Sequence, residues 1–86
     1  MLKISLTKQA IEDMVFFASS QPKLLVKITQ LFESISKSPF SGTGKPEPLK
    51  GDLSSYWSRR ITQEHRLVYK VEQEKVTIIQ CRFHYK

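Results

Sequence analysis

The sequence predicts an α+β fold in which two N-terminal helices pack on one face of a mainly antiparallel sheet of four or five strands. Three observations predict it. A short alternating segment is followed by two helical patterns, three strand-like segments come last, and a stretch rich in glycine and proline separates the two groups. With 86 residues, 40% of them hydrophobic, we expect a single domain over residues 1–86.

The N-terminal half reads as one strand and two helices. Apolar and polar residues alternate from Leu2 to Leu6, which is typical of a half-buried strand, and Thr7 can cap the helix that follows. Pro22 suits the first turn of the second helix, which ends at Ser38-Pro39. The predicted apolar face of the first helix holds Ile11, Met14, Val15 and Ala18. That of the second helix holds Leu24, Leu25, Ile28, Leu31, Phe32 and Ile35.

The C-terminal half begins with a loop and then turns to strands. Residues 40–51 hold all three glycines and two of the four prolines, so at most a short extended piece is expected there. The predicted strands are Tyr56–Thr62, Arg66–Glu72 and Lys75–Tyr85, the last two joined by a tight hairpin. On the last strand, alternation predicts a core-facing set of Thr77, Ile79, Cys81, Phe83 and Tyr85. The expected interface between helices and sheet includes Leu25, Ile28, Phe32, Ile79 and Cys81.

Charge and composition narrow the possible functions. Fourteen Lys and Arg against eight Asp and Glu give a net charge of +6, so the surface will attract nucleic acid, an acidic protein or an anionic membrane. The longest apolar run, residues 14–18, is far shorter than the roughly 20 residues that cross a bilayer. The N-terminus lacks a secretory signal pattern, and a single cysteine cannot form an internal disulfide. We therefore expect a soluble, cytoplasmic protein.

Two patterns that would indicate a cofactor or a metal are incomplete. Gly44-Lys45 lacks the remaining glycine and the hydroxyl residue of a phosphate-binding loop. Cys81, His65 and His84 have neither the number nor the spacing of ligands in a structural zinc site. No metal and no cofactor are expected.

Basic residues gather in the loop and the first C-terminal strands, as far as Arg66, interleaved with three aromatic residues, Phe40, Tyr56 and Trp57. The tail adds Arg82, His84, Tyr85 and Lys86 to this cluster. Cations and exposed aromatic rings suit single-stranded RNA, whose phosphates need neutralising and whose bases need a surface to stack on. An ordinary solvated sheet face is the alternative interpretation, and composition alone does not separate the two.

Within this cluster, three residues are of the types that metal-free RNA cleavage requires. Glu47 can act as a base, His84 as an acid, and Arg66 as the fixed cation beside the phosphorane. Each has a simpler interpretation: a loop acid, a surface histidine near the terminus, and a cross-strand ion-pair partner, respectively.

Five sequence blocks resemble the YoeB/Txe toxins, a branch of the RelE/ParE superfamily of bacterial toxin–antitoxin pairs, along the whole length of the chain. The blocks are Pro39-Phe40, Gly44-Lys45-Pro46-Glu47-Pro48-Leu49-Lys50, Trp57-Ser58-Arg59-Arg60-Ile61, Glu64-His65-Arg66-Leu67-Val68-Tyr69 and Cys81-Arg82-Phe83-His84-Tyr85. The resemblance implies a RelE-like microbial RNase fold and a toxin that cuts mRNA in the ribosomal A site and so inhibits translation. It also implies an acidic, YefM-like antitoxin as partner, and it is compatible with a homodimer.

The resemblance further implies roles for individual residues. Glu47 would be the general base, His84 the general acid and Arg66 the group that stabilises the transition state, while Tyr85 would orient the scissile nucleotide. Four basic residues match positions that can hold RNA backbone, namely Lys45, Lys50, Arg59 and Arg60. Departures from the family pattern, at Ser55, Phe83 and Lys86, remove no catalytic group.

Two other functions remain open on the same fold. Gyrase-inhibiting toxins act by binding protein and need no acid–base pair, and the presence of Glu47, Arg66 and His84 together argues against that function. A non-catalytic RNA- or antitoxin-binding module is the second alternative, since a complete set of residue types does not prove a productive geometry.

Overall fold

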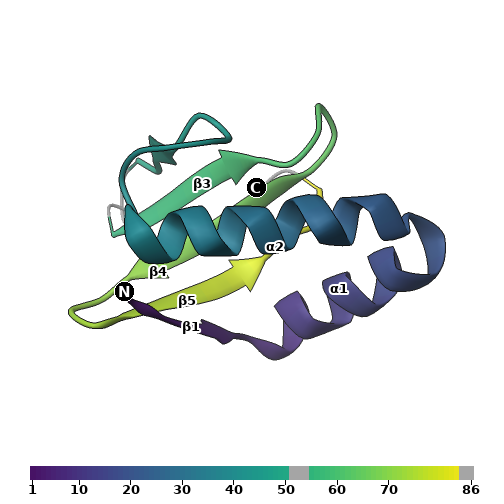
Figure 1. Ribbon diagram of the computed structural model, residues 1–86, viewed down its shortest axis with the longest axis horizontal. Coiled ribbons are helices and arrows are strands. Elements are labelled where there is room, and N and C mark those ends of the chain that lie inside the picture. The colour runs from purple at the N-terminus through teal and green to yellow at the C-terminus, as the bar shows by residue number, and fades with distance from the viewer. Residues whose placement is uncertain (51–54, 84–86) are drawn as a thin grey trace.

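Five strands form one mixed sheet in the order β1-β5-β4-β3-β2, and both helices cover one face of it (Figure 1). The computed structural model describes residues 1–50 and 55–83. Only β1 and β5 run parallel, and the other neighbouring strands are antiparallel. The α+β prediction is confirmed. The elements are β1 (Lys3–Leu6), α1 (Lys8–Ser20), α2 (Pro22–Lys37), β2 (Glu47–Pro48), β3 (Tyr56–Arg60), β4 (Arg66–Val71) and β5 (Lys75–Gln80).

Thr7 joins the start of α1 to the sheet. Its hydroxyl accepts a hydrogen bond from the Ala10 N–H at 3.1 Å, which caps the helix as the sequence predicted. The same hydroxyl donates to the carbonyl oxygen of Ile79 at 2.7 Å, so one side chain caps α1 and fixes its first turn beside the end of β5.

The predicted apolar face of α1 is wrong except for Met14, which is partly buried against the core. Ile11 and Val15 are exposed, whereas the buried residues of the helix are Ala10, Asp13 and Phe17. The Asp13 carboxylate accepts a hydrogen bond from the Cys81 backbone N–H at 3.0 Å, so a polar residue belongs to the buried face. Hydrophobic periodicity cannot detect such a residue, because its burial depends on a partner 68 positions away.

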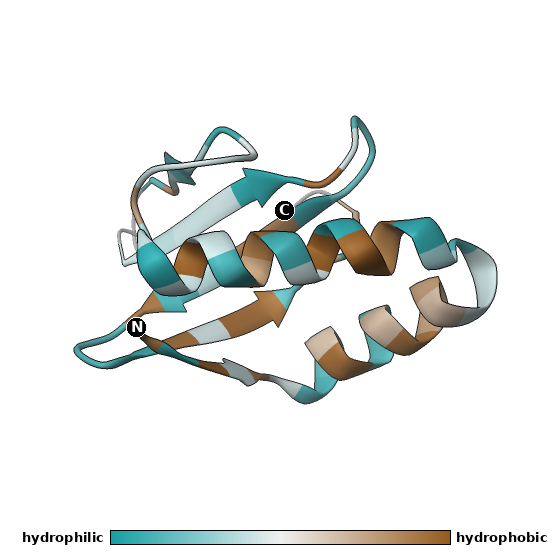
Figure 2. Ribbon diagram, in the orientation of Figure 1, coloured by the Kyte–Doolittle hydropathy of each residue, from teal (hydrophilic) through white to brown (hydrophobic). Residues whose placement is uncertain are grey.

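The predicted apolar stripe of α2 is confirmed. Ile28, Leu31 and Ile35 are buried, and the three other members of the stripe are partly buried against the same core. Hydrophobic residues recur along α2 where it crosses the sheet (Figure 2). Pro22 occupies the first turn, where its missing N–H costs the helix nothing.

An irregularity in β5 changes which of its residues reach the core. Tyr69 pairs with Ile78 and Val68 pairs with Gln80, so Ile79 is an extra residue on β5 without a partner on β4. Before it, Val76 and Ile78 face the core, and after it Cys81 does so. Strict alternation over this strand is therefore wrong. It correctly placed Cys81, but Thr77 and Ile79 lie outside the core and Phe83 is 50% exposed.

The C-terminal strands are shorter than predicted. β3 ends at Arg60 and β5 at Gln80, and β4 ends at Val71. Tyr85, the last member of the predicted core-facing set, lies outside the described residues. In the part of the chain that the structure describes, no helix is long and apolar enough to cross a membrane.

Candidate active site

The strand register places two of the candidate catalytic residues, Glu47 and Arg66, on the sheet face away from the helices. Glu47 pairs with Ser58 across β2 and β3, and Arg60 pairs with Arg66 across β3 and β4. Paired residues share a face, and so do residues two apart on one strand. Arg59, which lies between Ser58 and Arg60, instead contacts α2. We call the surface formed by Glu47, Ser58, Arg60 and Arg66 the open face.

Arg66 is held in place on the open face by Ser58. Its Nε and Nη2 atoms donate to the Ser58 hydroxyl at 3.1 and 3.0 Å, and Nη2 lies 3.8 Å from the Glu47 Oε2 atom. The Arg66 side chain is 14% exposed and that of Glu47 is 65% exposed. The result is a fixed guanidinium beside an accessible carboxylate, within ion-pair distance but without a direct hydrogen bond.

His84 and Tyr85 lie outside the described residues, and the described chain that precedes them is bound to the backbone of Arg66. The Arg66 backbone N–H donates to the Phe83 carbonyl oxygen at 3.1 Å. Phe83 directly precedes His84, so the chain reaches the residue predicted to be the acid from a point beside Arg66.

Three of the four predicted RNA-binding cations are exposed, namely Lys45, Lys50 and Arg60. The Arg60 N–H donates to the Gly44 carbonyl oxygen at 2.7 Å, which brings the next residue, Lys45, near Arg60. Lys45 has a φ angle of 52°, an uncommon value for a residue other than glycine. These side chains can meet a phosphate backbone that runs past the open face.

The fourth predicted cation, Arg59, is fully buried, so the expectation that it binds RNA is wrong. Its five N–H groups donate to five acceptors, at distances from 2.6 to 3.1 Å. The acceptors are the Tyr69 and Ser34 hydroxyls and the carbonyl oxygens of Ser38, Ser41 and Thr43. Arg59 therefore fixes the loop that leads to Lys45 and Glu47.

The aromatic residues of the basic cluster do not share one surface. Trp57 is partly buried against the core, and the Phe40 ring lies 5.0 Å from it, centroid to centroid. Tyr56 lies on the same face as Ser58, and its ring is 5.7 Å from the Lys70 Nζ atom. Of these three aromatic residues, Tyr56 is therefore the one on the side of the open face, where its ring can stack with a base.

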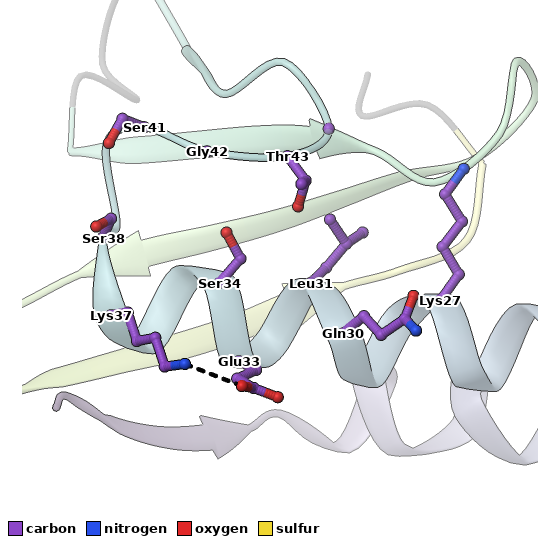
Figure 3. A pocket seen from close by; sticks show the side chains of 11 residues that line it. Lys27, Gln30, Leu31, Glu33, Ser34, Lys37, Ser38, Ser41, Gly42 and Thr43 are labelled. Atoms are coloured by element: carbon purple, nitrogen blue, oxygen red, sulfur yellow. Dashed lines mark hydrogen bonds and ion pairs between the residues drawn. The ribbon is translucent and has the colours of Figure 1, made fainter.

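A hollow of about 700 Å³ lies on the other side of the molecule, between α2 and the loop of residues 38–44 (Figure 3). Lys27, Leu31 and Ser34 line it from the helix, as do Glu33 and Lys37, which form an ion pair at 3.0 Å. None of the predicted site residues that the structure describes lines this hollow. Among the described residues, no three side chains of the types His, Cys, Asp and Glu come together as metal ligands would.

Comparison with known proteins decides the family. A family model described as the YoeB-like toxin of bacterial type II toxin–antitoxin systems matches residues 6–85. The chain belongs to the YoeB-like toxins. Ribosome-dependent RNA cleavage is the activity of that family. Toxin YoeB of Streptomyces coelicolor is 50% identical over 84 residues, which cover 98% of this chain and 100% of that protein.

Solved structures of YoeB proteins have the same fold. A YoeB/ParE toxin from Agrobacterium tumefaciens superimposes with a TM-score of 0.93 at 45% identity, covering 98% of this chain and 100% of that one. The Staphylococcus aureus YoeB dimer gives a TM-score of 0.90 at 44% identity over 98% of each chain. The YoeB–YefM complex of that organism gives 0.86 at 43% identity over 99% of each chain.

Sequence reasoning assigned no role to three residues that hold other parts of the site in place, namely Ser58, His65 and Tyr69. All three lie within the blocks that resemble the YoeB toxins, which was the signal available for them. Their partners are distant along the chain or across strands, so composition and spacing could not identify their contacts.

Proposed function

We propose that this YoeB-like toxin cuts mRNA in the ribosomal A site by a metal-independent attack of the 2′-hydroxyl on the adjacent phosphate. The observation that carries the proposal is the arrangement around Arg66. Its guanidinium is fixed by Ser58, lies 3.8 Å from the Glu47 carboxylate, and its backbone binds the residue before His84. A base, a cation and the backbone leading to an acid thus meet at one place.

The reaction would proceed as a single displacement at phosphorus. Glu47 accepts the proton of the 2′-hydroxyl, and the 2′-oxygen forms a bond to phosphorus while the bond from phosphorus to the 5′-oxygen breaks. His84 donates a proton to the departing 5′-oxygen, and Arg66 stabilises the charge that builds up on the phosphorane. The products are a 2′,3′-cyclic phosphate and a 5′-hydroxyl. Tyr85 is assigned to orienting the nucleotide that is cut.

Binding of the message would rest on a separate set of residues. Arg60 lies on the open face, and Lys45 and Lys50 are exposed in the segment that precedes β3, so all three can pair with phosphates of mRNA or ribosomal RNA. Such contacts neutralise charge and fix the register of the strand but carry no base preference.

The partner that silences the toxin would be an acidic antitoxin of the YefM type. The net charge of +6 and the accessible cations of the open face favour an acidic segment that covers this surface. The YoeB–YefM complex of Staphylococcus aureus supports such a partner, and the YoeB dimer of that organism supports a homodimer as the free form. Toxin and antitoxin would meet in the cytoplasm, where ribosomes translate.

Single-turnover cleavage of ribosome-bound message tests the proposal, because this measurement isolates chemistry from product release. Glu47→Gln and His84→Gln should each lower the rate by about 10²–10⁴-fold while ribosome binding persists. Glu12→Gln, an equivalent change at an exposed residue of α1, is the matched control and should cleave at the full rate. Message with a 2′-deoxy sugar at the attacking nucleotide should remain intact.

Four results would contradict the proposal. Full activity of His84→Gln would eliminate the assignment of the acid. Cleavage of the 2′-deoxy message would exclude attack by the 2′-oxygen. A wild-type protein that binds ribosomes without cutting would favour the non-catalytic binding module, and inhibition of gyrase by a protein that leaves ribosomes unaffected would favour the gyrase-inhibiting class.

A further inference from the structure

The segment after β5 is attached to the rest of the protein through its backbone. The Cys81 N–H donates to the Asp13 carboxylate at 3.0 Å, and the Phe83 N–H donates to the Nδ1 atom of His65 at 2.8 Å. The Phe83 carbonyl oxygen accepts from the Arg66 N–H at 3.1 Å. Both backbone polar groups of Phe83 are therefore hydrogen-bonded. The side chain of His65 binds its N–H, and the backbone N–H of Arg66, the first residue of β4, binds its carbonyl oxygen.

Phe83 needs such support because its backbone conformation is uncommon. Its φ angle is 63°, in the left-handed region that residues with a Cβ atom rarely occupy. A residue persists in that region only when its surroundings hold it there. The direction in which the chain continues toward His84 depends on this angle, and the hydrogen bonds on either side of the Phe83 Cα atom hold it.

His65 is itself held firmly. The residue is 3% exposed, its N–H donates to the Thr62 hydroxyl at 3.1 Å, and its carbonyl oxygen accepts from the N–H of Ile61 at 3.0 Å. The edge of its ring meets the Phe17 ring at 5.0 Å between centroids, and the Phe83 ring lies 5.6 Å away. The His65 backbone is thus held by the turn between β3 and β4, and its imidazole packs against Phe17 of α1.

The hydrogen bonds also assign the tautomer of His65. A backbone N–H only donates, so the Nδ1 atom that receives it carries a lone pair and no proton. The ring proton is then on Nε2, which lies 3.3 Å from the Glu64 Oε1 atom.

We propose that His65 is a positioning residue for RNA cleavage: as the neutral tautomer protonated at Nε2, it accepts the Phe83 N–H and so fixes the backbone of the residue that directly precedes His84. The inference rests on the proposed function, in which His84 donates a proton to the leaving oxygen. His65 touches no reacting atom and acts through Phe83 alone. Its place in the site is to hold the acid within range of the scissile bond, where small misplacement is costly.

Two substitutions separate a role of His65 in positioning Phe83 from a role in stability alone. One keeps the ring packing and removes the hydrogen-bond acceptor, and the other does the reverse. His65→Phe keeps a ring against Phe17 but removes the acceptor. His65→Asn loses the ring but keeps an oxygen at the position of Nδ1. If His65 positions the chain, His65→Phe should lower the single-turnover cleavage rate by about 10²-fold with ribosome binding unchanged, and His65→Asn should recover most of that loss.

A stability role predicts the reverse order. His65→Asn, which leaves a cavity, should then be the slower enzyme, and the rates should follow the urea midpoints. Ile35→Val, a mild core change in α2 far from Phe83 in sequence, is the stability control and should cleave at the wild-type rate. Rates that follow stability across the three variants would overturn the proposal.

Two readouts on the free protein do not depend on cleavage. Nitrogen-15 NMR of the wild-type imidazoles should show His65 protonated at Nε2 alone, and a proton on Nδ1 would overturn the inference even if neither variant folds. Hydrogen exchange at the Phe83 amide should accelerate in His65→Phe and remain slow in His65→Asn, and equal exchange in both would also overturn it. If the wild-type protein cut no message while these two results held, the proposed function would fail and the anchoring of Phe83 by His65 would stand.

Discussion

The guanidinium of Arg59 donates to the carbonyl oxygen of Ser38, the residue that ends α2, at 2.6 Å. The C-terminus of a helix carries partial negative charge, so a cation there is favourable. The same side chain binds the carbonyl oxygens of Ser41 and Thr43, which follow in the loop. Gly42 permits this approach, because a Cβ atom there would lie 2.6 Å from the Ser34 hydroxyl and 3.2 Å from an Arg59 nitrogen.

Replacing Arg59 should therefore reduce stability rather than RNA binding alone. Arg59→Lys keeps the charge but cannot make five hydrogen bonds, and each buried acceptor left unpaired costs about 1–3 kcal/mol. We expect the free energy of unfolding, measured with urea, to fall by about 2–4 kcal/mol. Arg60→Lys, on the neighbouring exposed residue, should change it by less than about 0.5 kcal/mol. Equal stability of the two variants, with binding lost only in Arg59→Lys, would restore Arg59 to the RNA-contacting set.

Ser58 should control the rate of cleavage through Arg66. Ser58→Ala removes the hydroxyl that accepts from both Nε and Nη2, so the guanidinium can turn away from the phosphate. We expect the single-turnover rate to fall about tenfold, equivalent to about 1.4 kcal/mol, with ribosome binding preserved. Ser58→Thr keeps the hydroxyl and should retain more activity than Ser58→Ala. Unchanged cleavage by Ser58→Ala would mean that Arg66 needs no such support.

The exposed cations should govern the salt dependence of ribosome or RNA binding. Each of Lys45→Ala, Lys50→Ala and Arg60→Ala should reduce the slope of log K against log salt by about one ion, since each removes one phosphate contact. The cleavage rate of the saturated complex should change little. Lys23→Ala, at an exposed lysine of α2, is the control and should leave the slope as it is. A variant that binds normally and cuts slowly would move its residue from binding to catalysis.

Alkaline pH should destabilise the protein, in part through Cys81. Burial, with a smaller contribution from the Asp13 carboxylate, raises the pKa of the Cys81 thiol from 9.0 to about 12. Burial also raises the pKa of the Tyr69 hydroxyl, against an opposing effect of Arg59. The unfolded chain therefore loses these protons at lower pH than the folded chain, so stability is full below about pH 9 and falls as pH rises toward 12.

Comparing the wild-type protein with Cys81→Ala isolates the contribution of the Cys81 thiol to the loss of stability at alkaline pH. Urea midpoints measured between about pH 8 and 11 should fall less steeply in Cys81→Ala than in the wild-type protein, because that variant no longer carries the buried thiol. Lysines titrate in the same range in both proteins, so only the difference between the two slopes is informative. Parallel slopes would show that the Cys81 thiol does not contribute.

The order of elements and the stripe of α2 could be read from the sequence because both depend on local patterns. The apolar spacing from Leu24 to Ile35 repeats with the period of a helix, and the glycines and prolines of residues 40–51 mark a loop wherever they occur. The residue types of Glu47, Arg66 and His84 likewise suggested acid–base chemistry before any geometry was known.

The position of each side chain that supports the site was decided by the tertiary structure. Arg59 and Arg60 are adjacent and chemically identical, yet one is fully buried under a loop and the other is exposed on the open face. Asp13 belongs to the core because of Cys81, and the unpaired Ile79 shifts the alternation of β5. Charge and periodicity are properties of a residue and its neighbours along the chain, whereas burial and hydrogen bonding depend on partners that only folding brings within reach.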